Sequence, residues 1–153
     1  MSQRINYQKV APKALKGMFE LEKYLANSGL ERSLYELVKL RASQINGCAY
    51  CIDMHTKDSR EAGETEQRLY ALSAWRETSF YSDRERAALE WTEALTLISE
   101  NDVPDSIYDA VRKHFGEEEL VTLTMAVIAI NSWNRLAISF RNEPGSYKPG
   151  KNE

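Results

Sequence analysis

The sequence predicts an all-α fold, a single domain of about seven helices. Apolar residues recur three or four positions apart through most of the chain, which is the spacing of one helix face. Glycine and proline fall between these periodic segments, where helices stop and start. No segment shows a convincing two-residue alternation of a strand. With 153 residues, 42% hydrophobic and 28% charged, the chain has the size and composition of a globular domain with a sizeable core.

Four helices are expected in the first half of the chain. The first carries Pro12 in its first turn, where a missing backbone N–H costs little, and it is stopped by Gly29. Gly47 and Gly63 stop the second and the third, because glycine readily adopts the left-handed conformation that ends helices. The fourth carries an apolar stripe that includes Trp75. These helices are predicted over residues 9–28, 31–46, 48–62 and 65–77.

Three further helices are expected in the second half. The fifth begins at a capping box, in which Ser82 and Glu85 exchange hydrogen bonds between side chain and backbone. Pro104 begins the sixth, and Gly116 closes it. The seventh is the longest, and acidic residues at its start complement the helix dipole. Its middle is apolar almost all round, so we expect it to run through the core or an interface. These helices are predicted over residues 82–98, 104–115 and 117–141.

We expect one helical domain, residues 1–141, followed by a polar C-terminal tail, residues 142–153, that is loose. The net charge of −3 and the scattered basic residues argue against a nucleic-acid partner. The N-terminus lacks the apolar run of a signal peptide, and no segment reaches the roughly 18 apolar residues of a membrane span. The expected location is therefore the cytoplasm, without a membrane partner, where thiols are normally kept reduced.

Both cysteines and one of the two histidines fall in residues 36–55. Cys48, Cys51 and His55 have the spacing C-x-x-C-x-x-x-H, and Glu36 lies twelve residues before the first cysteine. Positions i, i+3 and i+7 of a helix lie along one face, so both sulfurs and the imidazole are expected to point the same way. The first turn of a helix offers unpaired backbone N–H groups and the positive end of the dipole, which favour a thiolate.

This arrangement is typical of an activated cysteine nucleophile. His55 lies one turn from Cys51, so it can accept the thiol proton and then hold the thiolate as an imidazolium. A tight turn at Gly47 folds the helix of Glu36 back beside the cysteine helix, where the carboxylate can fix the tautomer of His55. Cys48 is placed to attack an oxidised Cys51 and form a disulfide, which an outside dithiol reduces again. We expect no bound cofactor and no metal.

Two other interpretations of the cysteines stay open. They could be two small core residues, because free cysteine is often buried. They could also form a zinc site with His55 and His114, since two Cys and two His make four ligands. His114 lies 59 residues after His55, however, in a segment typical of a helix C-terminus. Structural zinc sites usually pair two ligand clusters, and the sequence shows one.

The pattern E-x(11)-C-x-x-C-x-x-x-H, with its flanks over roughly residues 31–141, resembles the AhpD-like alkylhydroperoxidases of the carboxymuconolactone decarboxylase superfamily. The resemblance implies an AhpD-like fold that assembles as trimers or hexamers. It also implies a peroxidase or disulfide reductase that receives electrons from a lipoyl-type or other thiol donor. By position, Cys51 corresponds to the peroxide-attacking cysteine, Cys48 to the resolving cysteine, and His55 and Glu36 to members of the proton relay.

The chain departs from the family at one point of the motif. The best-studied peroxidases carry a second histidine directly before the second cysteine, where this chain has Tyr50. A phenol is a poor base at neutral pH, although it can donate a hydrogen bond. The resemblance also places part of the last helix near the active site. A buried Asn and an interface Trp explain that segment equally well, so its polar and aromatic residues stay outside the catalytic set: Asn131, Trp133, Asn134 and Arg135.

We therefore predict a thiol-dependent peroxidase or disulfide reductase that acts on a peroxide or a small disulfide. Its predicted catalytic residues are Cys51, Cys48, His55 and Glu36. The alternative is a redox-responsive oligomeric interaction protein without significant turnover, and a zinc-binding helical module ranks below both. Three tryptophans, eight tyrosines and the apolar last helix exceed what a small monomer readily hides, so we expect a homo-oligomer.

Overall fold

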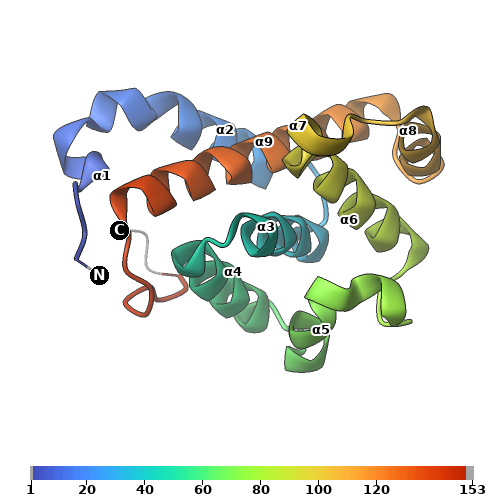
Figure 1. Cartoon of the computed structure of the whole chain (residues 1–153), viewed down its shortest axis with the longest axis horizontal. Coiled ribbons are helices and arrows are strands. Elements are labelled where there is room, and N and C mark those ends of the chain that lie inside the picture. Colours follow the sequence, from blue (N-terminus) through green and yellow to red (C-terminus); the bar gives the residue numbers. More distant parts are fainter. Residues whose placement is uncertain (1, 151–153) are drawn as a thin grey trace.

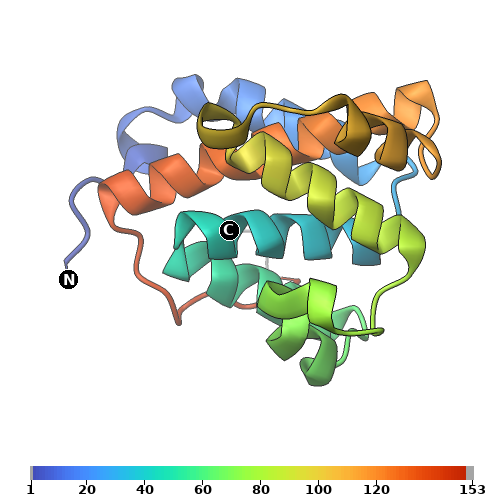
Figure 2. The ribbon, with the colours of Figure 1, turned by 45° about the vertical axis from the view of Figure 1, so that its right-hand side comes forward.

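Helix α3 (Arg32–Asn46) lies at the centre of the molecule, and the other long helices pack around it. The structure is a computed structural model and describes residues 2–150. In Figures 1 and 2, α9 (Glu117–Phe140) crosses one side of α3 and α4 (Ala49–Glu61) lies along the other. Helix α6 (Asp83–Thr96) packs against both α3 and α9, and α2 (Lys16–Ala26) lies along α9. This arrangement places the start of α4 beside the end of α3.

Shorter elements connect these helices, and residues 2–150 contain no strand. The all-α prediction is therefore confirmed. The shorter elements are α1 (Tyr7–Val10), the 3₁₀ turn η1 (Pro12–Leu15), α5 (Glu66–Ala71), the 3₁₀ segment η2 (Leu72–Glu77), α7 (Ile98–Asn101) and α8 (Asp105–Arg112).

All seven predicted segments are helical, but three of them break. The first breaks at Ala11, whose φ of −137° is not helical, because the proline ring that follows disfavours the α conformation at the preceding residue. The fourth passes into a 3₁₀ segment with a kink at Ala74. The fifth ends at Thr96, and a short turn of helix, α7, follows Leu97. The capping box of Ser82 is present as predicted.

Helix α3 is buried on most of its sides. Leu34 and Val38 join the core cluster formed with α6, α8 and α9. Leu37 and Leu40 join a second cluster with α5, η2 and α6, and Tyr35 joins a third with α2 and α9. Packing in three core clusters makes α3 a rigid support, because burying each apolar side chain stabilises the fold by about 1.5–3 kcal/mol. Polar side chains that α3 carries inward are therefore fixed in place.

Helix α9 is long and apolar enough, by length and composition, to cross a membrane. The expectation that no segment would reach this limit was therefore wrong. A core helix of a soluble protein passes the same test, and 44% of the apolar window of α9 is buried inside the structure. The helix contacts α2, α3, α4, α6 and α8, as expected for a core helix.

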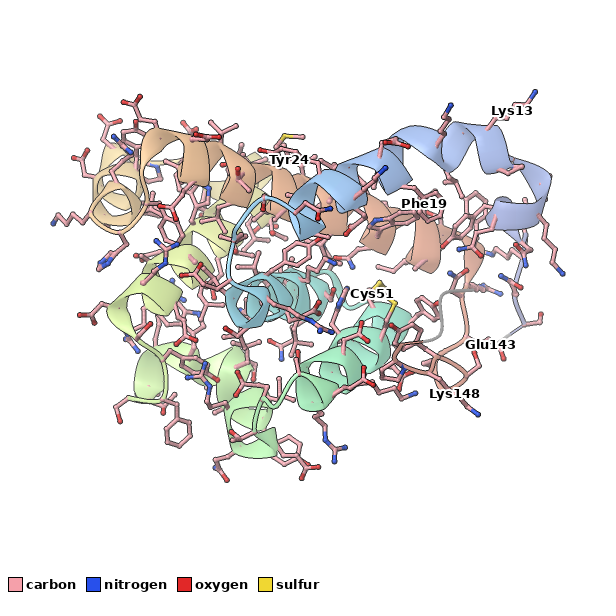
Figure 3. All side chains as sticks on the ribbon, turned by 180° about the vertical axis from the view of Figure 1, so that it is seen from behind. Lys13, Phe19, Tyr24, Cys51, Glu143 and Lys148 are labelled. Atoms are coloured by element: carbon pink, nitrogen blue, oxygen red, sulfur yellow. A yellow bond between two sulfur atoms is a disulfide. The ribbon has the colours of Figure 1, made fainter. Side chains whose placement is uncertain are left out.

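The described part of the C-terminal tail, residues 142–150, folds back onto α4. Figure 3 shows Glu143 and Lys148 beside this helix. Lys57 of α4 donates hydrogen bonds to two carbonyl groups of the tail, at 3.3 and 3.2 Å. We expected a loose tail; over these residues it is instead hydrogen-bonded, because α4 carries charged partners for its backbone. Residues 151–153 lie outside the described residues.

Candidate active site

The turn between α3 and α4 places the two cysteines. Gly47 ends α3 with a φ of +69°, a left-handed conformation that strains residues with a Cβ atom. The backbone N–H of Cys48 donates to the carbonyl of Ser43 (3.0 Å) and completes this helix end. Cys48 is the N-cap of α4, and its Sγ accepts a hydrogen bond from the N–H of Cys51 at 3.3 Å. The cysteine pair thus opens a helix, as the sequence predicts.

Cys48 and Cys51 are joined by a disulfide, with their Cα atoms 5.3 Å apart. Both residues are 1% exposed, and Ala137 of α9 packs against them together with the partly buried Tyr50. The Cα separation lies within the range that disulfides require, so a dithiol at these positions can form the bond without moving the backbone. The fold therefore holds a preassembled dithiol–disulfide couple.

His55 meets Glu36 across the contact between α3 and α4. Its Nδ1 lies 2.9 Å from Oε2 of Glu36, and the residues are 3% and 7% exposed. A carboxylate can only accept a hydrogen bond, so Nδ1 carries the hydrogen and Nε2 is left as the basic nitrogen. The prediction that Glu36 reaches His55 is confirmed.

The charge of Glu36 is stabilised in this position. Burial alone would raise the pKa of the carboxyl, but the hydrogen bond from His55 and the positive charges of His55, Lys39 and Arg32 outweigh this effect. The pKa therefore lies below its ordinary value of 4.5. At neutral pH Glu36 is therefore a carboxylate, and it holds the imidazole of His55 through their hydrogen bond.

A pocket of about 330 Å³, here called the Cys51 pocket, opens beside Cys51 and His55. Cys48 instead lines a separate hollow of about 390 Å³ with the end of α9 and the tail. In Figure 3, Phe19 of α2 and Cys51 of α4 are seen at the end of the molecule where the tail returns. Cys51 is thus the cysteine that shares a pocket with the base. The pocket is lined by Tyr7, Gln8, Phe19, Glu22, Lys39, Tyr50, Cys51, Met54, His55, Asp58, Trp133 and Ala137.

A polar cluster around Glu22 forms one wall of the Cys51 pocket. Glu22 accepts hydrogen bonds from the Tyr35 hydroxyl, from Lys39 Nζ (3.3 Å) and from Trp133 Nε1 (3.0 Å). The Lys39 ammonium also lies 3.9 Å from the centre of the Tyr35 ring. Burial and the neighbouring charge of Glu22 raise the pKa of Tyr35, so its hydroxyl remains a neutral donor. The cluster fixes the Trp133 ring at the pocket.

The other three residues noted in the last helix form hydrogen bonds within the protein: Asn131, Asn134 and Arg135. Asn134 is fully buried and donates to Ser43 Oγ (3.0 Å), while Asn46 donates to the side-chain oxygens of Asn134 (2.9 Å) and Asn131 (3.0 Å). Arg135 donates to the backbone carbonyl of Asn131. These bonds fasten the C-terminal end of α3 to α9, so of the four residues only Trp133 lines the Cys51 pocket.

Residues 12–94, more than half of the 153-residue chain, match the family model described as the carboxymuconolactone decarboxylase family. An uncharacterized protein of Bacillus subtilis, YdfG, is 51% identical over 95% of this chain and 99% of its own length. The chain belongs to the carboxymuconolactone decarboxylase family. A crystal structure from Agrobacterium tumefaciens superposes with a TM-score of 0.92 and 47% identity, covering 95% of this chain and all of that one. It is of a protein of unknown function provisionally described as the antioxidant defence protein AhpD.

Other similar proteins carry names that state a reaction. Alkyl hydroperoxide reductase AhpD of Mycobacteroides abscessus is 49% identical over 31% of this chain and 28% of its own length. The debrominase Bmp8 shares the fold at 16% identity, with a TM-score of 0.75 over 88% of this chain and 73% of that chain. The carboxymuconolactone decarboxylase fold therefore does not decide the reaction by itself, and the site residues must.

Three side chains of this family member could hold a metal ion. Glu36, His55 and Asp58 each offer one ligand atom, and these atoms lie within 4.8 Å of one another. The zinc site considered from the sequence has a different composition. His114 lines a hollow with Trp75 and other residues, none of which lines the Cys51 pocket, so the two cysteines and two histidines do not form one site.

The sequence analysis missed several residues that line the Cys51 pocket. Asp58 follows His55 by three residues and Cys51 by seven, so the same helical spacing could have found it. Glu22 carries no such signal, because its partner Trp133 lies 111 residues away. Tyr50, which replaces the expected histidine, lines both the Cys51 pocket and the hollow beside Cys48.

Proposed function

We propose that this protein is a thiol-dependent oxidoreductase that reduces a peroxide or a small disulfide by cycling Cys48 and Cys51 between dithiol and disulfide. The observation that carries the proposal is the position of Cys51, at a pocket shared with His55, whose imidazole is hydrogen-bonded to the buried Glu36. Cys48 stands within disulfide distance on the other side. The named AhpD relatives support the same chemistry, although they match less than a third of the chain.

The cycle with a peroxide balances without a further cofactor. His55 takes the proton of the Cys51 thiol, and the thiolate attacks one peroxide oxygen as the O–O bond breaks. His55 returns the proton to the leaving oxygen, which departs as an alcohol or water and leaves a sulfenic acid on Cys51. The Cys48 thiol then displaces water and forms the disulfide. An outside dithiol, for example of the lipoyl type, reduces this disulfide and is itself oxidised.

Three further features belong to the proposal. The protein acts in the cytoplasm, which supplies thiol reductants. It assembles as a homo-oligomer, because α9 exposes Val121, Ile128 and Ile138 at 62%, 47% and 46%. The resemblance to AhpD-like proteins implies a trimer or hexamer. The substrate occupies the Cys51 pocket, while the reductant is an external thiol. No nucleic acid and no membrane takes part.

Stopped-flow kinetics on the reduced protein test the proposal. Trp133 and Cys51 line the same pocket, so we expect the fluorescence of Trp133 to change when Cys51 is oxidised. We expect oxidation by an alkyl hydroperoxide, hydrogen peroxide or lipoamide, followed by many turnovers when a dithiol is present. Cys51→Ser abolishes turnover, and Cys48→Ser stops at an oxidised Cys51. Unchanged peroxide and disulfide consumption by Cys51→Ser would refute the proposal. Comparing the three oxidants separates a peroxidase from a disulfide reductase.

A redox-responsive interaction protein is the second candidate. The disulfide packs against Ala137 of α9, directly before the exposed Ile138, so its oxidation state can alter the surface of α9. The same samples decide between the two functions. A single oxidation that changes the oligomer size, without repeated turnover, supports the interaction protein. Repeated turnover at constant size supports the enzyme.

A further inference from the structure

The C-terminal tail is clamped to the outer side of α4 next to the Cys51 pocket. The backbone N–H of Gly145 donates to Asp53 Oδ2 (2.9 Å), and Lys57 Nζ donates to the carbonyls of Gly145 and Tyr147. Lys57 and Asp53 also pair with each other at 2.9 Å. These contacts come from successive turns of one helix, so they fix the tail along α4 and deliver the side chain of Tyr147 to a defined place.

The side chain of Tyr147 contacts Asp58, which lines the Cys51 pocket. The Tyr147 hydroxyl donates to Asp58 Oδ1 at 2.7 Å. Cys51, His55 and Asp58 occupy positions i, i+4 and i+7 of the chain through α4, so they follow one another along a single face. His55 comes between Cys51 and Asp58 in this order along the helix face, and Glu36 reaches its imidazole from α3.

The contact between Tyr147 and Asp58 involves a hydroxyl that stays protonated. Burial raises the pKa of Tyr147, and the hydrogen bond to Asp58 and its negative charge raise it further. The phenol is therefore a permanent donor at physiological pH, and a charge-assisted hydrogen bond of this kind orients the side chain of Asp58. The ligand atoms of Asp58, Glu36 and His55 lie within 4.8 Å of one another, so two carboxylates face the imidazole.

We propose that Asp58 and Tyr147 complete the active site: Asp58 is a positioning residue that orients His55 beside Cys51, and Tyr147 of the tail holds Asp58 in place. This inference rests on the proposed thiol chemistry. When the Cys51 proton moves to His55, the new positive charge lies near the carboxyl groups of both Glu36 and Asp58, which favours the thiolate form of Cys51. The arrangement supplies a second polar partner for the base in a chain that has Tyr50 in place of the expected histidine.

The remaining ionisable groups around the base come from several elements. Glu22 of α2 and Lys39 of α3 form an ion pair at the Cys51 pocket, and Tyr7 and Tyr50 line it as well. Arg32 acts on Glu36 through its charge. Asp58 differs from all of these because it shares the helical face of Cys51 and His55, and because it is held by the tail.

Alkylation of a single thiol tests the inference without peroxide. In a Cys48→Ser background, Cys51 is the one remaining cysteine, and its reaction with iodoacetamide is followed by mass spectrometry between pH 5 and 9. Asp58→Asn should slow alkylation at pH 7 about fivefold and move the midpoint upward by about 0.7 pH units. Tyr147→Phe, which removes only the hydroxyl, should slow it about twofold. The double variant should match Asp58→Asn alone, because both changes act through one carboxylate.

Tyr70→Phe is the matched control, since Tyr70 also donates to a carboxylate, that of Glu66 at 3.1 Å, but lies outside the Cys51 pocket. Its alkylation profile should equal that of the parent, and circular dichroism checks that every variant is folded. Unshifted profiles for Asp58→Asn and Tyr147→Phe would overturn the inference, as would independent effects that multiply in the double variant. Stoichiometric zinc on the parent that Asp58→Asn loses would also overturn it. A shifted profile in a protein without turnover would refute the proposed function and leave this inference standing.

Discussion

The carboxylate of Glu36 and the imidazole of His55 form a buried pair across two helices, with Oε2 and Nδ1 2.9 Å apart. Glu36→Gln keeps the size of the side chain but removes its charge. We expect the free energy of unfolding to fall by about 1–3 kcal/mol and the alkylation of Cys51 at pH 7 to slow about tenfold. Glu66→Gln, in an exposed pair with Arg60, should cost less than about 1 kcal/mol. An unaltered alkylation rate in Glu36→Gln would remove Glu36 from the mechanism.

The Glu36–His55 pair also predicts how the free energy of unfolding depends on pH. The pKa of Glu36 is lower in the folded protein than its ordinary value of 4.5, so folding favours the ionised form. Its contribution to stability is therefore complete above pH 4.5 and is lost as the pH falls toward the folded pKa. Urea unfolding should be measured at pH 7, 5, 4 and 3. The difference in the free energy of unfolding between the parent and Glu36→Gln should become smaller as the pH falls. A difference in the free energy of unfolding that stays constant or grows toward low pH would contradict the lowered pKa of Glu36.

The pair was accessible from the sequence because it depends on local geometry. The spacing of Cys48, Cys51 and His55 defines one helix face, and Gly47 defines the turn that brings α3 back beside α4. The helices themselves follow from apolar spacing and from glycine and proline, which also explains why Pro12 interrupts the first one.

The rest of the pocket depends on packing between distant segments. Glu22 reaches Trp133 over 111 residues, and Tyr147 reaches Asp58 over 89 residues. Neither contact leaves a periodic signal, and a polar tail with proline and glycine resembles any loose terminus. The tail was therefore the largest difference between the sequence prediction and the structure, because its partners are charged side chains on the surface of α4.

Two buried serines predict opposite responses to the loss of a hydroxyl. Ser43 is fully buried, donates to the Lys39 carbonyl (2.8 Å) and accepts from Asn134 (3.0 Å). Ser59 is 2% exposed, and its Oγ has no hydrogen-bond partner among residues 2–150. Ser43→Ala should lower the free energy of unfolding by about 1–3 kcal/mol, while Ser59→Ala should leave it equal or raise it by up to about 1 kcal/mol. Chemical denaturation measures both, and equal losses would contradict the assignment.

Two glycines form a second matched pair. Gly47 has a φ of +69° and Gly17 lies within α2, and beyond the adjacent backbone neither has a described atom within 4 Å of where a Cβ would stand. Alanine therefore changes only backbone preferences. Gly47→Ala should cost about 1–2 kcal/mol, because left-handed backbone is strained for alanine, whereas Gly17→Ala should gain about 0.5–1 kcal/mol. Thermal unfolding monitored by circular dichroism compares them, and a neutral Gly47→Ala would show that the α3–α4 turn tolerates other conformations.

The exposed face of α9 predicts assembly. Val121 and Ile128 lie seven residues apart, so they share one helix face, and they are 62% and 47% exposed. Exposed apolar side chains aligned in this way favour contact with another copy of the chain. Light scattering at micromolar concentration should therefore give an oligomer of the 17.5 kDa chain, of the trimer or hexamer size that the resemblance to AhpD-like proteins implies. The double variant Val121→Asp, Ile128→Asp should give monomers, because burying two carboxylates in an apolar interface is costly. Ile98→Asp, at a 55% exposed isoleucine of α7, should leave the assembly intact. A monomeric parent protein would contradict the prediction, and an intact oligomer in the double variant would move the interface away from this face.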